Sequence, residues 1–337
     1  MRNKIGVLGL GWWGTKLARA LAAQQGFSPG LMVGVDPLAS RREEAEKTLG
    51  FTTVADPGRV LDDEDIAAVV VATPPSTHFG LAQAALGAGK HVLVTKPPTS
   101  TLGELEILVR EAETRRVVFM LDSTFVYSDP VQKIRELLDA GAVPDIRFVQ
   151  SLRYGNDLRF HHVGRLRDTM LANGVDVVRD LVFHDLAVIT HLFPGMRIRP
   201  AAVHKANTLA KFTASEYAGT MCDTAFLRLE TDRFPIHIGL SWVLPERRRE
   251  LLIASGEVQL VYDDLKPENK ISMFRIEDKH EELVAHGQRE PLALVVEHFL
   301  DCIKNRKRPM TDGRYMLDVM RLFDEIKECR QNERSLP

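Results

Sequence analysis

The sequence predicts an α/β protein in which a doubly wound parallel sheet at the N-terminus precedes an α+β domain with a largely antiparallel open sheet. Three observations predict this fold class. A glycine-rich turn joins the first apolar run to a helical pattern, short β-rich runs then alternate with helical patterns up to residue 121, and closely spaced β-rich runs fill the second half. The pattern changes near Asp122, so we place the two domains at residues 1–122 and 123–337.

The composition is that of a globular protein, with 45% hydrophobic and 27% charged residues. A net charge of −2 gives no electrostatic reason to bind nucleic acid or an anionic membrane. The longest apolar runs, such as residues 66–72, have the length of strands and are too short to span a bilayer. Cys222, Cys302 and Cys329 lack the spacing of a zinc site, and the first strand leaves no room for a signal peptide. We therefore expect reduced thiols, no metal and a cytoplasmic location.

The first element is a strand at residues 5–8, which runs into a G-x-G-x-x-G sequence and then a helix. This sequence consists of Gly9, Leu10, Gly11, Trp12, Trp13 and Gly14. The first glycine can form a tight turn, the second lets phosphate oxygens approach the backbone, and the third allows close packing of helix and strand. The N-terminus of the helix is then open to a diphosphate. The strand–turn–helix order predicts a Rossmann dinucleotide-binding domain over residues 1–122.

Asp36 ends the second predicted strand, residues 31–35, about 20 positions after the glycine run. At this place an acid accepts the ribose hydroxyls of NAD, and its charge would repel the 2′-phosphate of NADP. Arg41 and Arg42 lie close enough in sequence to face a 2′-phosphate or the adenine. We therefore expect NAD as the cofactor, with NADP the less favoured alternative, and count Arg41 among the cofactor-binding residues.

The remaining helices and strands are predicted from the same helical and strand patterns of apolar residues. In the first domain, helices are predicted at residues 41–49, 79–88 and 102–115, and strands at 52–54, 66–72, 90–94 and 117–121. In the second, helices are predicted at residues 130–140, 175–193, 291–305 and 313–328, and strands at 145–154, 202–207, 224–230, 235–244, 250–254, 257–262 and 270–276. The short connections between these strands predict an antiparallel or mixed sheet with one exposed face, which is a candidate oligomer surface.

Ligands bind a parallel sheet at the carboxyl ends of its strands, and two polar segments lie there. In the first, Thr73, Pro74 and His78 could contact the cofactor, and the alternative for His78 is a structural role in a rigid loop. Lys96 and Pro97 form the second and are likewise candidates for contacting the cofactor. The Lys96 ammonium could donate to a substrate hydroxyl or to a developing alkoxide.

The predicted helix at residues 175–193 carries Asp176, Asp180 and His184 at intervals of four, which predicts one polar stripe on an apolar helix. Such a stripe costs stability unless it is paired or faces a cavity. Three interpretations stay open: a buried Asp–His pair, a metal site, or a general base with its orienting acid.

The long loop over residues 155–174, with the end of the strand before it, is rich in arginine, histidine and asparagine. Arg153 and Asn156 are candidates for binding an anionic group of a substrate, and the same composition also suits a solvated loop.

Together these motifs resemble those of the glucose-fructose oxidoreductase, inositol dehydrogenase and rhizopine-catabolism family of NAD(P)-dependent sugar oxidoreductases. The likeness covers nearly the whole chain and is carried by residues 9–14, 73–78, 89–97, 180–184 and 290–292. The Trp12–Trp13 pair and residues 124–128 and 180–185 look most like members that act on sugar nucleotides.

The resemblance implies that Lys96, Asp180 and His184 are catalytic and that they contact the substrate together with Tyr127. One position departs from the family pattern. Glutamate usually precedes the lysine, and this chain has Thr95 there. Losing that carboxylate affects how Lys96 is oriented and how its pKa is set, because a neighbouring acid favours the ammonium form.

We therefore expect an NAD(P)-dependent dehydrogenase or ketoreductase acting on a sugar or sugar nucleotide. His184 would take the hydroxyl proton, Lys96 would stabilise the oxyanion, and Asp180 would orient the sugar or the imidazole. Two alternatives stay open: an NAD-dependent glycosidase that oxidises its sugar transiently, and a cofactor-binding regulator without catalysis. We also expect a homodimer or homotetramer formed through the C-terminal sheet.

Overall fold

The computed structural model describes residues 4–155, 175–208, 222–277 and 279–329. The chain folds into two compact units. The first consists of residues 1–128 and 289–320, and the second of residues 129–288 and 321–337. The late helix α11 (Pro291–Asn305) therefore belongs to the first unit, because it packs on α1 (Trp12–Ala22) and α6 (Thr124–Tyr127). The predicted boundary at residue 122 does not include the return of residues 289–320 to the first unit.

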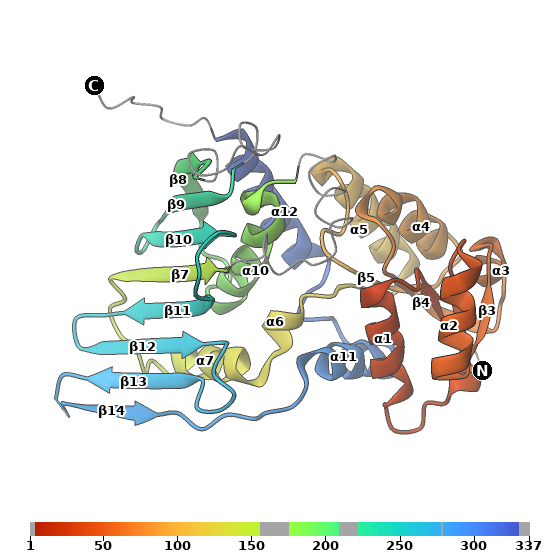
Figure 1. The fold of residues 1–337 in the computed structure, drawn as a ribbon, viewed down its shortest axis with the longest axis horizontal. Helices are drawn as coiled ribbons and strands as arrows, with labels where there is room; N and C mark the ends of the chain where they lie inside the picture. Colours follow the sequence, from red (N-terminus) through yellow and green to blue (C-terminus); the bar gives the residue numbers. More distant parts are fainter. Residues whose placement is uncertain (1–3, 156–174, 209–221, 278, 330–337) are drawn as a thin grey trace. The chain divides into compact units, whose positions relative to one another are not determined.

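The first unit is built on a six-stranded sheet in the order β3-β2-β1-β4-β5-β6, and every neighbouring pair is parallel (Figure 1). The strands are β1 (Lys4–Leu8), β2 (Met32–Val35), β3 (Thr52–Val54), β4 (Ile66–Val71), β5 (His91–Val94) and β6 (Phe119–Leu121). This is the order of a Rossmann fold, so the predicted doubly wound sheet is confirmed. Consecutive valines in β4 are fully buried, as expected for a strand with helices on both faces of its sheet.

The helices of the first unit begin where local chemistry favours a start. They are α1, η1 (Pro29–Leu31), α2 (Ala39–Leu49), α3 (Gly58–Leu61), α4 (Pro75–Gly87), α5 (Leu102–Arg115), α6 and α11. Helix α4 starts at Pro75, earlier than the apolar pattern predicts, because the first helical position needs no N–H donor and suits proline. Helix α5 opens with a capping box, in which Thr101 and Glu104 each bond the other's backbone N–H.

The second unit contains an eight-stranded sheet in the order β14-β13-β12-β11-β7-β10-β9-β8. The strands are β7 (Phe148–Tyr154), β8 (Ile198–Ala206), β9 (Thr224–Thr231), β10 (Ile236–Ser241), β11 (Arg248–Ala254), β12 (Val258–Asp263), β13 (Ile271–Arg275) and β14 (His280–Leu283). Strands β7 and β10 pair in parallel and all other neighbours are antiparallel. The predicted largely antiparallel sheet is confirmed, although β14 has no apolar alternation and was not predicted.

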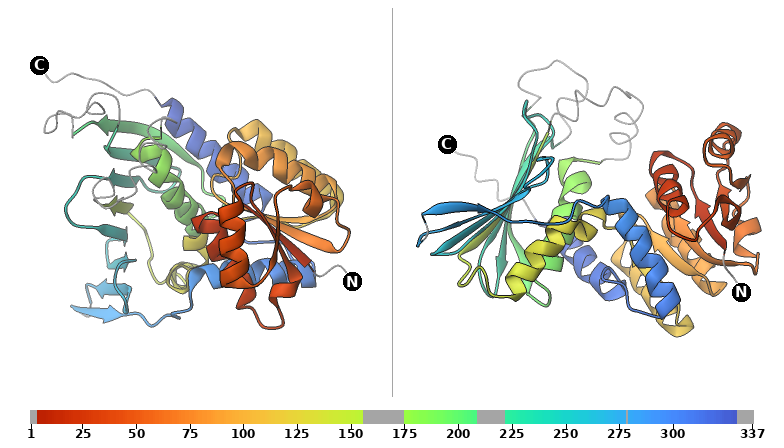
Figure 2. Two further views of the ribbon diagram at one scale, coloured as in Figure 1. Left: turned by 45° about the vertical axis from the view of Figure 1, so that its right-hand side comes forward. Right: turned by 90° about the horizontal axis from the view of Figure 1, so that it is seen from below.

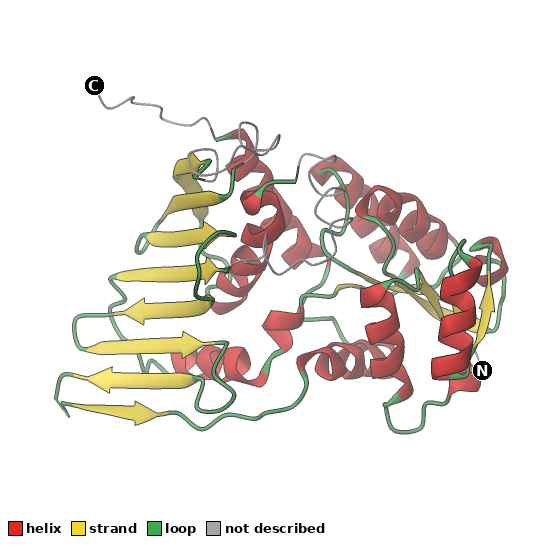
Figure 3. Ribbon diagram, viewed as in Figure 1, coloured by secondary structure: helices red, strands yellow, loops and turns green. Residues whose placement is uncertain are grey.

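Helices α7 (Asp129–Asp139) and α10 (Phe183–Leu192) lie against one face of this sheet (Figure 2). Side chains along β9 alternate between the two faces of the sheet: Leu227 and Leu229 are buried, and Phe226 and Arg228 are exposed. Within the described ranges, no helix covers the other face of the sheet (Figures 2 and 3). The unit therefore has one buried and one open sheet face.

The predicted helix at residues 175–193 differs from a regular α-helix. Residues Val178–Val182 form a π-helical turn (η2), and α10 continues from it. Helix α12 (Gly313–Glu328) closes the described chain and contributes residues to both units. No helix in the described ranges is long and apolar enough to cross a membrane.

Candidate functional site

The glycine-rich turn lies at the carboxyl end of β1, and two of its three glycines leave no room for a side chain. Gly9 has φ +93°, and a Cβ there would lie 2.6 Å from the Ala72 carbonyl oxygen. A Cβ on Gly14 would collide with the Gly9 carbonyl oxygen. At Gly11 the nearest atom would be Arg41 Nη1 at 3.9 Å, so the space beside this residue is open. The turn is therefore close-packed on the strand side and accessible at its middle glycine, as a backbone cradle for phosphate needs.

Helix α1 leaves its N-terminal N–H groups open to a ligand. Its N-cap, Gly11, provides no side-chain acceptor, and the first turn holds no acidic residue. Because the first N–H groups of a helix have no partner within the helix, they require an acceptor from elsewhere. A diphosphate supplies such oxygens, and its charge is favoured at the positive end of the helix dipole.

Asp36 connects β2 to the glycine-rich turn. Its side chain is almost fully buried, and its Oδ2 accepts the Leu10 N–H at 3.0 Å while its Oδ1 accepts the Leu38 N–H at 2.9 Å. Arg41 Nη1 lies 3.3 Å from Oδ2, and Arg42 Nη1 donates to the Asp36 carbonyl oxygen at 2.7 Å. Both carboxylate oxygens thus have protein donors, and two guanidinium groups gather at this strand end.

The two tryptophans of the glycine run have different surroundings. Trp13 Nε1 donates to Asp122 Oδ2 at 2.6 Å, and Thr124 Oγ1 donates to Asp122 Oδ1 at 2.7 Å. Burial raises the pKa of Asp122, and these two hydrogen bonds oppose that rise. Trp12 is 72% exposed, with Lys16 Nζ 3.9 Å from its ring centroid. Trp13 therefore fixes the start of α1 against the end of β6, whereas Trp12 presents an aromatic surface to a ligand or solvent.

His78 is fully buried and bridges the segments that follow β4 and β5. Its Nδ1 lies 2.8 Å from the Pro97 carbonyl oxygen, and its Nε2 lies 2.7 Å from the Thr73 carbonyl oxygen. Because carbonyl oxygens only accept, the neutral imidazole can donate to only one of the two. Burial lowers the pKa of His78, and the two carbonyl groups act against that shift. The structure thus favours the structural role for His78 over the predicted cofactor contact, because the ring has no exposed surface.

Lys96 follows β5 after a single residue, Thr95, and is half-buried. The buried Thr95 Oγ1 donates to the Val71 carbonyl oxygen at 3.3 Å and lies 3.5 Å from His78 Nε2. The position that usually holds glutamate in the family therefore contributes a neutral hydroxyl beside His78.

Tyr127 lies in the interior of the first unit. Its hydroxyl is 2.8 Å from Thr311 Oγ1, and its ring centroid is 5.3 Å from that of His298 on α11. Burial raises the pKa of the Tyr127 hydroxyl. This packing does not support the predicted contact between Tyr127 and substrate.

In the second unit, the three residues of the predicted polar stripe, Asp176, Asp180 and His184, do not share one role. Asp176 precedes the helix, where its Oδ1 accepts the Arg179 N–H at 2.8 Å and its Oδ2 lies 3.1 Å from Lys205 Nζ. It therefore caps the helix start. Asp180 lies in the π turn and His184 in the first turn of α10, and both are partly exposed. Because π turns occur frequently at functional sites, the irregular turn marks Asp180 and His184 as the candidates within this helix.

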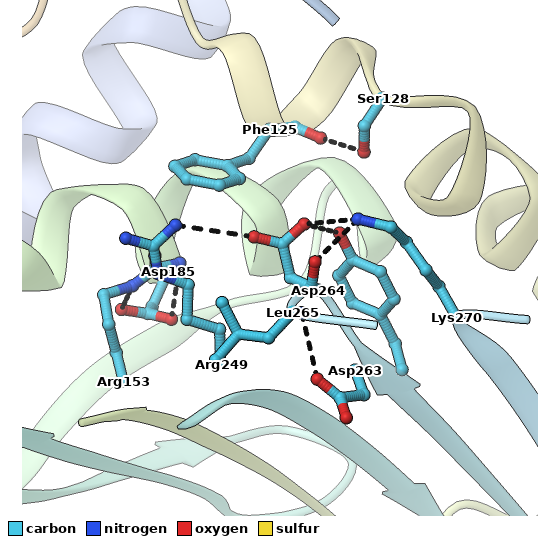
Figure 4. A network of polar contacts seen from close by, with 10 residues as sticks. Phe125, Ser128, Arg153, Asp185, Arg249, Asp263, Asp264, Leu265 and Lys270 are labelled. Atoms are coloured by element: carbon cyan, nitrogen blue, oxygen red, sulfur yellow. Dashed lines mark hydrogen bonds and ion pairs between the residues drawn. The ribbon is translucent and has the colours of Figure 1, made fainter. Parts of the chain in front are cut away.

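Arg153 already has a partner in the second unit (Figure 4). Its Nε is 3.0 Å from Asp185 Oδ2, and Ser151 Oγ donates to Asp185 Oδ1 at 2.7 Å. Asp185 is 3% exposed, so this pair joins β7 to α10 from within the unit. The guanidinium thus has a structural role that competes with the predicted binding of substrate. Asn156 lies outside the described residues.

Sequence reasoning missed Asp122 and Asp185 as partners. Asp122 follows β6 directly, so its position at a strand end is a signal that could have singled it out. Asp185 adjoins His184 but has no periodicity that would connect it to Arg153. Within the described ranges, no group of three or more His, Cys, Asp or Glu side chains is arranged to hold a metal ion.

The parallel sheet in the order 3-2-1-4-5-6, with its glycine turn and open helix N-terminus, defines an NAD(P)-binding Rossmann domain. Residues 3–123 match the model of the oxidoreductase family with an NAD-binding Rossmann fold. Over these residues the chain is similar to this family, and the curated relatives that it resembles include an inositol 2-dehydrogenase of Mycolicibacterium gilvum, to which it is 30% identical over 199 residues.

Two curated relatives act on nucleotide-linked sugars by their names. The chain is 33% identical over 132 residues to dTDP-3,4-didehydro-2,6-dideoxy-alpha-D-glucose 3-reductase of Streptomyces violaceoruber, covering 36% of this chain and 39% of that protein. It is 26% identical over 320 residues to UDP-N-acetylglucosamine 3-dehydrogenase of Acidithiobacillus ferrooxidans, covering 92% and 91%. For three of the curated relatives that it matches, the chain spans only 39%, 40% and 52% of their length.

Solved structures share the fold over nearly the full chain. A 3-ketoreductase from Actinomadura kijaniata, determined with NADP and TDP-benzene, superposes with a TM-score of 0.81 at 17% identity over 98% of both chains. The Acidithiobacillus ferrooxidans enzyme superposes with a TM-score of 0.79 at 23% identity over 97% of both chains. At these identities the likeness establishes a common architecture.

Proposed function

We propose that this protein is an NAD(P)-dependent oxidoreductase that transfers a hydride between nicotinamide and a hydroxyl or keto carbon of a sugar nucleotide. The observation that carries the proposal is the arrangement of the first unit. The glycine turn, Asp36 and Lys96 all follow the carboxyl ends of strands in one Rossmann sheet, where a dinucleotide and its reaction partner bind. The names of the relatives that act on nucleotide-linked sugars support the class of substrate.

The residues of this chain would supply placement and proton chemistry. When bound, the nicotinamide cofactor would supply hydride chemistry at the carbinol carbon, in either direction. The Lys96 ammonium would stabilise the developing negative charge on the substrate oxygen. His184 would take the proton of the hydroxyl group, and Asp180 would orient either the imidazole or the sugar. The open N–H groups of α1 would hold the cofactor diphosphate.

The surroundings of Asp36 bear on the choice between NAD and NADP. Both of its carboxylate oxygens accept backbone N–H groups, and Arg41, half-exposed, offsets its charge. These contacts weaken the repulsion on which the expected preference for NAD depends, and Arg41 and Arg42 supply cations for a 2′-phosphate. We therefore propose that the protein accepts both cofactors, with Arg41 as the main contact to NADP.

Substitution of Lys96 tests the proposal directly. We expect Lys96→Ala to lower kcat for a sugar nucleotide by about 10²–10³-fold, the range seen when a preorganised oxyanion donor is removed. The Kd of the cofactor, measured by quenching of tryptophan fluorescence, should change little because the glycine turn is intact. Lys16→Ala, at an exposed position of α1, is the matched control and should retain turnover. Near-normal turnover in Lys96→Ala would remove the residue from the mechanism.

We further propose that the protein forms a homodimer or homotetramer through the open face of its C-terminal sheet. The strand registers place Phe226, Leu152, Leu252, Val261 and Phe274 on the face opposite to the buried one. Phe226 is 53% exposed and Phe274 is 40% exposed. An apolar stripe across several strands favours a partner, and a second copy of the same stripe would be complementary to it. We also propose a cytoplasmic location, in keeping with Cys222, Cys302 and Cys329, none of which forms a disulfide.

A further inference from the structure

A second concave site lies in the first unit, at the amino ends of the strands. A cavity of about 840 Å³ is bordered by the C-terminal ends of α5 and α11, the start of α12 and the first residues of β5 and β6. His91, the first residue of β5, lines it, whereas Lys96 follows the other end of the same strand. The volume is within the range of small-molecule sites. This groove is therefore separate from the candidate dinucleotide site, which lies at the opposite ends of the strands.

The rim of the groove is strongly basic. Its basic residues are Arg116, Arg306, Lys307, Arg308 and Arg314. Lys307 pairs with Asp301 at 2.9 Å, and Arg308 pairs with Asp312. Arg116, Arg306 and Arg314 make no ion pair with any described residue. Glu113 is the one further carboxylate in the lining, so an excess of positive charge remains on a chain whose net charge is −2.

Two of these arginines occupy backbone positions that favour glycine. Arg116 has φ +55° as the C-cap of α5, and Arg306 has φ +53° as the C-cap of α11. A left-handed conformation strains a residue with a Cβ, and helices commonly place glycine there. The helix dipoles favour cations at these helix ends, and Arg115 and Lys304 in the last turns already supply one each without a left-handed backbone. The two strained arginines border one groove, which indicates a function for their side chains.

The floor of the groove suits a planar, partly apolar group. It includes Val109, Ala112, Val117, Phe119 and Ile303. His91 adds a polar group, because its Nδ1 accepts the Val118 N–H at 2.9 Å and burial lowers its pKa. The neutral ring therefore carries its proton on Nε2, which has no acceptor among the described residues and can donate to a ligand.

We propose that this groove binds a nucleoside diphosphate as an effector separate from the catalytic site. The phosphates would pair with Arg306, Arg314 and Arg116, whose planar guanidinium groups match phosphate oxygens. The base would lie on the apolar floor, within reach of the His91 Nε2–H. This proposal does not rest on the proposed activity, because it concerns residues at the other ends of the strands.

Calorimetric titration of ADP into the full-length protein saturated with NADP tests this site, since NADP then fills the Rossmann site. We expect saturable binding with a Kd below about 1 mM. The double variant Arg306→Ala/Arg314→Ala should bind ADP about tenfold more weakly or worse, because it removes two charge-assisted phosphate contacts. The matched control Arg59→Ala/Arg110→Ala changes two exposed arginines of the same unit outside the groove and should bind as the unmodified protein does.

Three results would overturn the proposal. The first is no saturable binding of ADP to the NADP-loaded protein, and the second is unchanged affinity in Arg306→Ala/Arg314→Ala. Pyrophosphate that binds as tightly as ADP would show that the groove recognises an anion without its nucleoside. The experiment measures the heat of ADP binding and not turnover. A protein that does not bind ADP in the groove can therefore still be an oxidoreductase, and a protein without oxidoreductase activity can still bind ADP there.

Discussion

At the scale of single residues, Trp13 illustrates how a bulky side chain in a glycine-rich turn can be structural. Its indole N–H is bonded to the buried carboxylate of Asp122, whose pKa is raised by burial. Trp12, its neighbour, contacts Lys16 and is mainly exposed. Trp13 is therefore held by a buried hydrogen bond, whereas Trp12 is exposed at the start of α1.

Replacing Trp13 with phenylalanine should destabilise the protein by about 1–3 kcal/mol, because a buried polar group loses a hydrogen-bond partner. Trp12→Phe is the matched control and should stay within about 0.5 kcal/mol, as is usual for exposed positions. Urea denaturation followed by circular dichroism measures both free energies of unfolding. Equal effects of the two substitutions would mean that the Trp13–Asp122 bond contributes no net stability.

The candidate site was predictable from sequence where residue type and strand-end position coincide. Gly9, Gly14 and Asp36 occupy the structural places that the motif requires. His78, Tyr127 and Arg153 show the limit of such reasoning, because all three have polar side chains with internal partners. A sequence does not reveal whether a histidine bonds to two backbone carbonyl groups, since those groups come from segments distant along the chain.

At the scale of elements, the close contact between the start of α1 and the turn after β1 leaves no room for a side chain at Gly14. We expect Gly14→Ala to weaken NADP binding by about tenfold or more, because the turn must move to avoid the new Cβ and its N–H groups lose their alignment. Fluorescence titration with NADP measures the Kd.

Gly80 in α4 provides the matched control, since a Cβ there would meet no atom within 4 Å. Gly80→Ala should leave the Kd unchanged and increase the free energy of unfolding by about 0.5–1 kcal/mol, the usual gain of alanine over glycine in a helix. If Gly14→Ala bound NADP with the same Kd as Gly80→Ala, the role assigned to the glycine-rich turn would be contradicted.

The fold was predictable at this scale where hydrophobic periodicity is strong. The six parallel strands follow runs such as β4, in which every side chain except that of Ala67 is buried. Helix α4 begins earlier than its apolar pattern because of Pro75, and β14 is exposed along its whole length and therefore carries no pattern. The π turn at Val178–Val182 depends on tertiary packing, which a regular spacing of polar residues does not report.

At the scale of the whole molecule, the open face of the eight-stranded sheet predicts self-association. Phe226→Asp should convert the oligomer to monomers, because a charge would be buried at the centre of the proposed interface. Ile107→Asp, a comparable exposed change on α5, is the control and should preserve the oligomer. Light scattering coupled to size-exclusion chromatography gives the mass. An unmodified protein that is already monomeric at micromolar concentration would refute the interface.

The central claim is that a sugar nucleotide is oxidised or reduced with the nicotinamide as hydride partner. Its most direct test follows the absorbance of reduced nicotinamide when UDP- and dTDP-linked sugars are added to the protein with NAD or NADP. We predict formation of reduced cofactor in proportion to oxidised sugar with at least one substrate, and its loss in Lys96→Ala. Cofactor binding without hydride transfer to or from any of these sugars, or cleavage of the glycosidic bond with no net reduced cofactor, would contradict the account.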